Sequence, residues 1–429
     1  MIPALLAALQ IAAAPDSIPV VTLAEALERA ASLDPDYVAA AGQVDNAEWA
    51  RRAALAVFLV PAVTVSANRT QYNPPSFNLA TFSPSPTSYT VLLDARIDLF
   101  TGGQKLAGLA VSRAALEGAR AGELQARLTT AMSTESDFYA VLAQRALLQV
   151  AEDQLGRAGQ QFAVARARVV SGAVVQTDSL QLSLERTQAQ VARLQLQATV
   201  RTAQLQLGRR IGLDGPADAV LLPGDTGLAP ALPFTMEEAV ARALAQGPSW
   251  RIARANERVA QAQLRSQRGA YLPHASLAFN AGAFDTTFYP KFAKRTTLSL
   301  TVTLPLWDHG QREIQVSQAR VGRDVARAIR ADLERSARRD VTSAYDAYTT
   351  SRATVELTRE AVAVARENNR VQETRYRAGA TTILDLLEAQ NRLVGAEAAL
   401  VVAVYDMRRA RAGLEVILGE RITFNQESQ

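Results

Sequence analysis

The sequence contains no cysteine and only two histidines among its 429 residues. The lack of cysteine excludes disulfides, thiolate metal sites and a cysteine nucleophile. His274 follows a proline where a strand is predicted to begin, and His309 lies in a Trp-Asp-His-Gly turn, so we interpret both as structural. The sequence also lacks phosphate-binding loops, dinucleotide fingerprints and nucleophile elbows. We therefore expect no enzyme activity, no cofactor and no metal site.

Long apolar runs and a concentrated charge are missing as well. No stretch of about 18 apolar residues occurs, so no transmembrane helix is expected. The net charge is +4, and the arginines alternate with acidic residues, so nucleic acid is not an expected partner. Residues 1–14 form a short apolar run that ends in three alanines, which is typical of a secretory signal peptide. Export from the cytoplasm is therefore predicted.

An internal duplication organises the rest of the chain. The segment Val21–Leu27 reappears as Phe234–Val240, and the Pro-Ala-Val of residues 61–63 matches the Pro-His-Ala of residues 273–275. Further matches follow in the same order toward the end of each copy. Because several landmarks recur in one order, we divide the chain into repeat 1 (residues 15–211), a linker (212–233) and repeat 2 (234–429).

Each copy contains two segments in which apolar and polar residues alternate, so strands are predicted at about 62–70, 88–99, 275–283 and 296–305. In the second of these, Val91, Leu93, Ala95 and Ile97 alternate with Thr90, Asp94, Arg96 and Asp98, although Leu92 interrupts the polar side. The apolar face fits either an ordinary soluble sheet on a core or strands that cross an outer membrane. Four strands cannot close a barrel, so the membrane alternative requires oligomerisation, and three copies supply twelve strands.

The remaining sequence is rich in residues typical of long helices. Between about residues 310 and 376 the only helix breaker is Gly322, which predicts a rod of roughly 100 Å. Apolar residues recur at heptad spacing on both predicted hairpins, and we interpret all of them as buried seam residues. They are Val341, Tyr348, Val355, Val362, Leu386, Leu393, Leu400, Met407 and Leu414 in repeat 2, and Leu180, Leu184, Thr187, Val191, Leu194, Ala198 and Leu205 in repeat 1.

The predicted hairpin tips are the most specific motifs. Arg168–Ala173 is followed by Asp178, and Arg375–Ala380 is followed by Asp385. Together with the duplication and the strand pairs, these tips resemble the TolC-type outer-membrane factor family over essentially the whole mature chain. The resemblance implies a mainly α protein with a β-barrel portion, in which a homotrimer forms a twelve-stranded barrel in the outer membrane and a tunnel of coiled-coil hairpins in the periplasm.

The resemblance also implies roles for individual residues. Asp385 and Glu388 would form the acidic gate and selectivity rings, and Asp178 and Tyr376 would join neighbouring hairpins at the closed entrance. The tips that would dock onto an adaptor are Ser171, Gly172, Ala173, Ala378, Gly379 and Ala380, and the residues that would line the barrel lumen are Asp94, Arg96 and Asp98. The gate arginine of some members is replaced by Thr381, so Arg377 or Arg375 would have to substitute. Asp385 also suits a simpler role as a helix cap.

The function that follows is the exit duct of a tripartite efflux pump or a type I secretion system, with passive, gated export from the periplasm. Its implied partners are a periplasmic adaptor of the membrane fusion protein class and an inner-membrane pump. The alternative is a periplasmic coiled-coil adaptor or scaffold. Such a protein would have one hairpin and small β-rich domains, and it would need no detergent in solution.

Overall fold

The computed structural model describes residues 18–78, 82–170, 176–221, 230–285 and 293–422. The chain forms two compact units, each built from separate stretches of sequence. Unit 1 contains the residues up to Val38 with Gln125–Ala243 and Arg339–Gln429, and unit 2 contains Ala39–Leu124 and Leu244–Arg338. Every point at which the chain passes from one unit to the other lies inside a helix. Among the described residues, no helix has both the length and the apolar composition of a membrane-spanning helix.

The main elements follow one order twice, which is helix, helix, strand, strand, helix, helix. The first copy consists of α1 (Leu23–Leu33), α2 (Pro35–Leu59), β2 (Ala62–Asn78), β3 (Ser83–Thr101), α3 (Gln104–Val170) and α4 (Gln176–Arg210). The second copy consists of α5 (Met236–Gln246), α6 (Pro248–Gly269), β5 (His274–Asp285), β6 (Ala293–Thr303), α7 (Gln311–Arg377) and α8 (Ile383–Leu418). This order is consistent with the tandem repeat inferred from the sequence.

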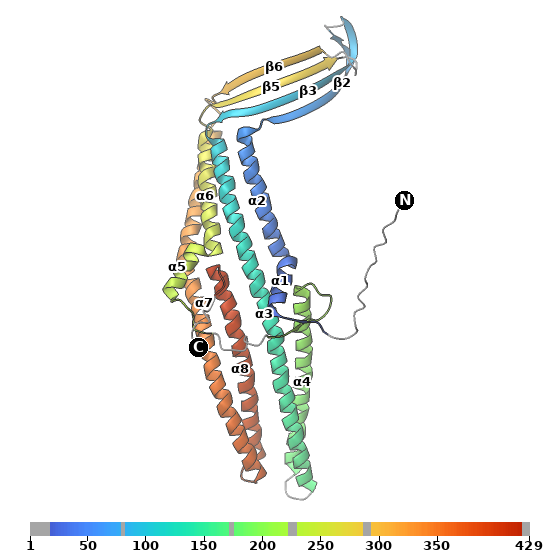
Figure 1. Ribbon diagram of the computed structural model, residues 1–429, viewed down its shortest axis with the longest axis vertical. Helices are drawn as coiled ribbons and strands as arrows, with labels where there is room; N and C mark the ends of the chain where they lie inside the picture. The colour runs from blue at the N-terminus through green and yellow to red at the C-terminus, as the bar shows by residue number, and fades with distance from the viewer. Residues whose placement is uncertain (1–17, 79–81, 171–175, 222–229, 286–292, 423–429) are drawn as a thin grey trace, which may run out of the picture. The chain divides into compact units, whose positions relative to one another are not determined.

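The four long strands form one antiparallel sheet in unit 2, in the order β2-β3-β5-β6 (Figure 1). Its cross-strand partners place most of the apolar residues of all four strands on one face. Val65 lies opposite Leu93, and Leu93 lies opposite Ala281. The other face is mainly polar, although Leu92 and Phe284 lie on it. One row across it consists of Thr64, Asp94, Asn280 and Thr297. The alternation seen in the sequence is therefore in register across the sheet.

The strands differ in length from the predicted ranges. β2 and β3 extend beyond 62–70 and 88–99, and their register shifts in the stretch that contains the Pro74-Pro75 pair. Proline has no N–H for the ladder, so pairing stops there and resumes further along, which alternation alone does not reveal. In the second copy, β6 ends at Thr303 rather than near 305. Pro305 offers no N–H and restricts the residue before it.

Within unit 2, no described element covers the apolar face of the sheet (Figure 1). The exposed fraction is 70% for Val65, 69% for Leu298 and 65% for Val302. A soluble antiparallel sheet normally buries such a face on a core. The outer strands β2 and β6 also have one open edge each. The sheet therefore needs two kinds of partner, one for its face and one for its edges.

The longest helices begin directly after the sheet. α3 and α7 have 67 residues each, so each is about 100 Å long. Gly102, with φ 59°, lies between β3 and α3 and contacts Gly269 at the end of α6. A Cβ on Gly102 would lie 2.1 Å from the Gly269 carbonyl oxygen, and a Cβ on Gly269 would lie 2.5 Å from that of Gly102. Only glycine fits at both positions.

The heptad seam predicted for the hairpin of α7 and α8 is buried except at Leu400, which is half-buried. Val341, Tyr348 and Val355 on α7 have no exposed surface, and neither do Leu386 and Leu414 on α8. Tyr348 and Val355 of α7 pack against Ala403 and Met407 of α8, as their spacing predicts. Leu386 is buried together with Ala165 and Leu182 of the other hairpin.

The seam predicted for α4 is wrong. Its apolar residues are exposed, with exposed fractions from 47% to 63%, and they are Leu180, Leu184, Val191, Leu194 and Leu205. The buried side of α4 instead carries Leu182, Ala189, Val200 and Leu207. Leu182 and Leu184 are separated by about 200° around the helix, at 100° per residue. α4 is therefore apolar on two opposite sides, and the sequence period did not say which side its own hairpin covers.

Unit 1 also contains a small core around a two-stranded parallel sheet. β1 (Val20–Val21) pairs with β4 (Asp218–Ala219), which lies inside the predicted linker. Val21, Phe138 and Leu207 are buried together next to this sheet. The core thereby joins the beginning of the described chain to α3, α4 and the segment between the repeats.

Candidate functional site

The turn between α7 and α8 is the hairpin tip that the structure describes, because the predicted tip residues Ser171, Gly172 and Ala173 lie outside the described residues. Gly379 has φ 72°, in the left-handed region that favours glycine. Its N–H donates to the carbonyl oxygen of Tyr376 at 3.0 Å, and the N–H of Ala380 donates to that of Arg375 at 2.8 Å. These bonds close the end of α7 and explain why the tip carries a glycine.

Asp385 caps the beginning of α8. Its carboxylate accepts hydrogen bonds from the Thr381 hydroxyl at 2.8 Å, the Thr382 hydroxyl at 2.7 Å and the Thr382 N–H at 3.1 Å. Together with the bond from the Asp385 N–H to the Thr382 hydroxyl, they form a capping box. The hydrogen bond from the Thr382 side chain is the main cause that lowers the pKa of Asp385. Asp385 is therefore negatively charged at neutral pH while it caps the helix.

Glu388 lies one turn after Asp385 on the same helix face. It pairs with Arg392 on its own helix, and both side chains are exposed. An exposed pair of this kind contributes little to stability. Two carboxylates thus lie close to the tip, and their place in a charged ring stays a prediction.

Tyr376 lies in the last turn of α7, where the two hairpins meet. It is buried in a cluster with Ala165 of α3, Leu182 of α4 and Leu386 of α8. Burial is the main cause that raises the pKa of Tyr376, followed by the negative charge of Asp178. Asp178 is half-buried in the first turn of α4. The structure therefore brings together Tyr376 and Asp178, which the sequence placed on different hairpins.

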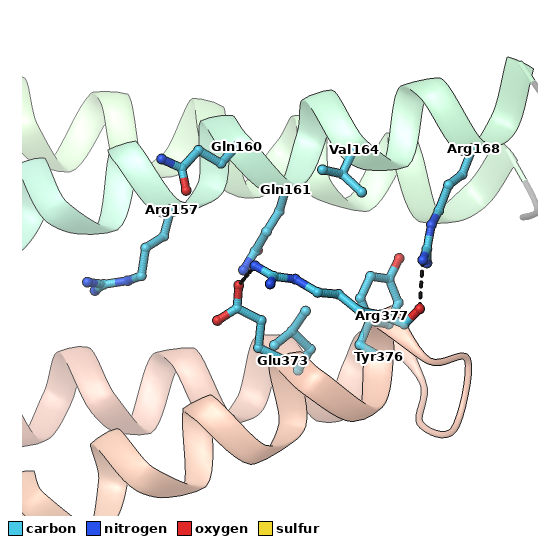
Figure 2. Close-up of a pocket in the computed structure, with 9 residues that line it drawn as sticks. Arg157, Gln160, Gln161, Val164, Arg168, Glu373, Tyr376 and Arg377 are labelled. Carbon is cyan, nitrogen blue, oxygen red and sulfur yellow. Dashed lines mark hydrogen bonds and ion pairs between the residues drawn. The ribbon is translucent and has the colours of Figure 1, made fainter.

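An arginine that the sequence analysis gave no role crosses between the hairpins. Arg168, in the last turn of α3, donates from Nη2 to the carbonyl oxygen of Arg377 at 2.7 Å (Figure 2). The suggested substitutes both bond within their own hairpin, because Arg377 pairs with Glu373 and Arg375 donates to the Ala380 carbonyl oxygen. A sequence signal existed, since Arg168 is the repeat-1 counterpart of Arg375.

A small cavity lies between α3 and the α7/α8 hairpin (Figure 2). It has a volume of about 60 Å³ and is lined by Arg157, Gln160, Gln161, Val164, Arg168, Glu373, Tyr376, Arg377 and Leu386. Within the described part of the chain, Nη2 of Arg157 and Oε1 of Gln161 are buried without a hydrogen-bond partner. Each such group costs on the order of 1–3 kcal/mol. The junction between the hairpins therefore combines the apolar cluster around Tyr376 with buried polar groups.

The predicted lumen residues share one face of β3. Arg96 Nε lies 3.6 Å from Asp98 Oδ1, and Asp94 belongs to the same polar face. The alternation ends just beyond them, where the register between β3 and β5 shifts between Asp98 and Phe100. The sheet therefore presents a charged face opposite its apolar face, and the contact of either face with a lumen stays a prediction.

The histidines take local roles. His274 Nε2 lies 3.4 Å from Gln104 Oε1, and His309 occupies a turn with φ 58°. In the described segments, no group of three or more His, Asp or Glu side chains is arranged to hold a metal ion.

The sequence profile of the family described as outer membrane efflux protein matches residues 26–213 and 239–420. The two matched segments cover most of the chain and coincide with its two copies of the element order. The chain belongs to the outer membrane efflux protein family.

Individual members of the outer membrane efflux protein family agree with this assignment. The outer membrane efflux protein BepC of Brucella suis biovar 1 (strain 1330) is 28% identical over 357 residues, which are 81% of this chain and 76% of BepC. The outer membrane protein VceC of Vibrio cholerae has a TM-score of 0.75 at 18% identity, over 94% of this chain and 97% of VceC. The open-state MtrE outer membrane channel of Neisseria gonorrhoeae has a TM-score of 0.78 at 19% identity, over 95% and 91%. These two structures share the fold.

As a member of the outer membrane efflux protein family, the protein is located in the outer membrane and has a transport role rather than a catalytic one.

Proposed function

We propose that this protein is the exit duct of a tripartite efflux pump or a type I secretion system, through which cargo passes passively from the periplasm to the exterior. The observation that carries the proposal is the sheet, which has an uncovered apolar face, a charged opposite face and two open edges. Lipid covers the apolar face, and water fills the space beside Asp94, Arg96 and Asp98.

The open edges require further copies of the chain. Unpaired backbone groups are not tolerated in the hydrocarbon region of a membrane, and a closed barrel takes about eight strands or more. Four strands per chain therefore close only when β2 of one copy pairs with β6 of the next. Three copies give a barrel of twelve strands, and their long hairpins form the wall of a periplasmic tunnel.

The entrance lies at the hairpin tips. In three copies, Asp385 and Glu388 form rings of negative charge that favour cations and oppose anions. The tip at Ala378, Gly379 and Ala380, with its counterpart at Ser171, Gly172 and Ala173, docks onto a periplasmic adaptor that connects to an inner-membrane pump. A relative supports the link to a pump, since the toluene efflux pump outer membrane protein TtgC of Pseudomonas putida is 25% identical over 288 residues.

The closed entrance is held by contacts between hairpins. Tyr376 packs against the first hairpin, and Arg168 bonds to the end of α7. The polar cavity beside them limits how strongly the closed state is favoured. Opening separates the hairpins and exposes these polar groups to water, which satisfies them.

Single-channel conductance in planar bilayers tests the duct and its gate together. We expect detergent-purified protein to form stable cation-selective pores, and we expect Asp385→Asn with Glu388→Gln to weaken that selectivity. Thr382→Ala is the matched control, because it removes the capping box and keeps both charges. Well-folded protein that needs no detergent and forms no pores would instead indicate a periplasmic scaffold.

A further inference from the structure

The cavity between α3 and the α7/α8 hairpin has a wall that is rich in positive charge. Three arginines line it together with one acidic side chain, and these residues are Arg157, Arg168, Arg377 and Glu373. The carboxylate of Asp178, which lies beside the buried tyrosine of the tip, adds a second negative charge nearby. Positive charges therefore outnumber negative charges around the cavity, so it favours an anion over a cation.

The charge of Arg157 has no counter-ion among the described residues. Its Nη2 is buried, and it has no hydrogen-bond partner in that part of the chain. By contrast, Arg377 pairs with Glu373, and Arg168 donates to the carbonyl oxygen of Arg377. A guanidinium group stays charged at every physiological pH, so its burial without a counter-ion is costly. An anion beside Arg157 removes that cost.

Gln161 and Arg377 supply further donors to the same cavity. Gln161 follows Arg157 by one helical turn, and its buried Oε1 has no hydrogen-bond partner among the described residues. Figure 2 shows Arg157 and Gln161 directed from α3 toward α7, and the side chain of Arg377 running back toward Gln161. Because an amide can rotate by half a turn, Gln161 can present its NH2 group to the same space. Donors from both hairpins therefore surround one volume.

The size of the cavity limits the kind of anion that it can hold. Its volume is about 60 Å³. A buried water needs about 10–15 Å³ in such a cavity, so the space corresponds to about four to six waters. This room suits a tetrahedral oxyanion and is too small for a nucleotide or a peptide. The forked donors of arginine also match such an oxyanion, because two N–H groups can bind two of its oxygens.

We propose that this cavity binds a tetrahedral oxyanion, with inorganic phosphate as its simplest form, through Arg157, Gln161 and Arg377. The oxyanion joins the two hairpins, since Arg157 and Gln161 belong to α3 and Arg377 ends α7. It also supplies the counter-ion that the buried Arg157 lacks in the closed arrangement of the hairpins. Bound phosphate therefore favours the closed entrance. This last step rests on the proposed duct, whereas the binding site itself does not.

Isothermal titration calorimetry of the detergent-purified protein with inorganic phosphate, at constant ionic strength, tests the site. We expect saturable binding of phosphate at millimolar concentration, with competition by sulfate and much weaker competition by chloride. Arg157→Gln should lower the affinity for phosphate about tenfold or more, because it removes a charge-assisted pair of donors. Arg157→Lys keeps the charge without the fork and should lower the affinity less. Arg166→Gln is the matched control, since it removes the same charge from an exposed position of α3 and should leave the affinity unchanged.

Two results would overturn the site. One is equal affinity for phosphate in the parent protein and in Arg157→Gln, and the other is equal affinity of the parent protein for phosphate and chloride. The comparison of phosphate with chloride needs no variant, so it decides the question even if Arg157→Gln does not fold. A parent protein that binds no phosphate contradicts the site as well.

Conductance in planar bilayers tests the effect on opening separately. Phosphate on the periplasmic side should lower the open probability of the parent protein several-fold relative to chloride, and it should have no effect on Arg157→Gln. If phosphate binds in calorimetry but leaves the open probability unchanged, its link to the entrance is wrong and the binding site remains supported. Protein that binds phosphate but forms no pores contradicts the proposed duct and supports the oxyanion site.

Discussion

The two hairpins carry the same heptad pattern, but the structure uses it differently in each. On α8, Leu386 and Leu414 are fully buried. On α4, Leu184 and Leu194 are 58% and 57% exposed. Both helices have the period of a coiled coil, yet only one of the two patterns is satisfied within the chain. Heptad spacing therefore predicts an apolar side on a helix, without showing whether the chain itself covers that side.

The largest expected contrast comes from truncation of one leucine in each pattern. Leu414→Ala should lower the free energy of unfolding by about 2–5 kcal/mol, because it leaves a cavity in a packed seam. Leu194→Ala should change the stability of a single copy by no more than about 0.5 kcal/mol, because its side chain is exposed there. Denaturant titrations at two protein concentrations measure both. If both variants lose a similar free energy of unfolding at both concentrations, the buried position on α8 and the exposed position on α4 do not differ as expected.

The sheet allows a similar comparison, because the adjacent residues Val65 and Ser66 lie on opposite faces. Val65→Arg places a charge on the apolar face and should destabilise the membrane-inserted protein by about 2–4 kcal/mol. Ser66→Arg places the same charge on the polar face, where it should alter ion selectivity and leave stability nearly unchanged. Folding into lipid vesicles in a urea series, followed by conductance, measures both effects. Equal destabilisation by the two arginines is incompatible with lipid on one face only.

A smaller effect is expected from the two equivalent tip arginines. Arg168→Gln should remove the bond between hairpins and raise the ratio of open to closed channels about tenfold, which corresponds to about 1.4 kcal/mol. Arg375→Gln is the matched control, since Arg375 bonds within its own tip. Open probability in planar bilayers distinguishes them. If the Arg375 variant opens as readily, the contact of Arg168 does not hold the entrance.

The parts that sequence predicts best depend on local periodicity. The ends of α7 follow from the absence of helix breakers, and the two faces of β3 follow from alternation. The capping role of Asp385 was also foreseeable, because Thr382 precedes it at capping-box spacing.

The parts that sequence misses depend on which segments meet in space. The bond from Arg168 to Arg377 joins residues far apart in the chain. The repeat relates Arg168 to Arg375, but neither local sequence specifies the partner of Arg168. The exposure of Leu184 and Leu194 on α4 also depends on which segments meet in space. The continuation of β2 past Pro74-Pro75 was missed for another reason, since pairing with β3 outweighs the local disfavour of proline.

The duplicated sequence and the compact units divide the molecule in different ways. Both units take segments from both repeats, and the two central strands of the sheet, β3 and β5, come from different repeats. A chain divided between the repeats would give two fragments, each with half of the sheet and a newly exposed strand edge. Neither fragment would contain the complete sheet, and each would need the other to pair its newly exposed strand. One repeat alone therefore supplies half of the sheet, and the complete sheet forms only when both repeats meet.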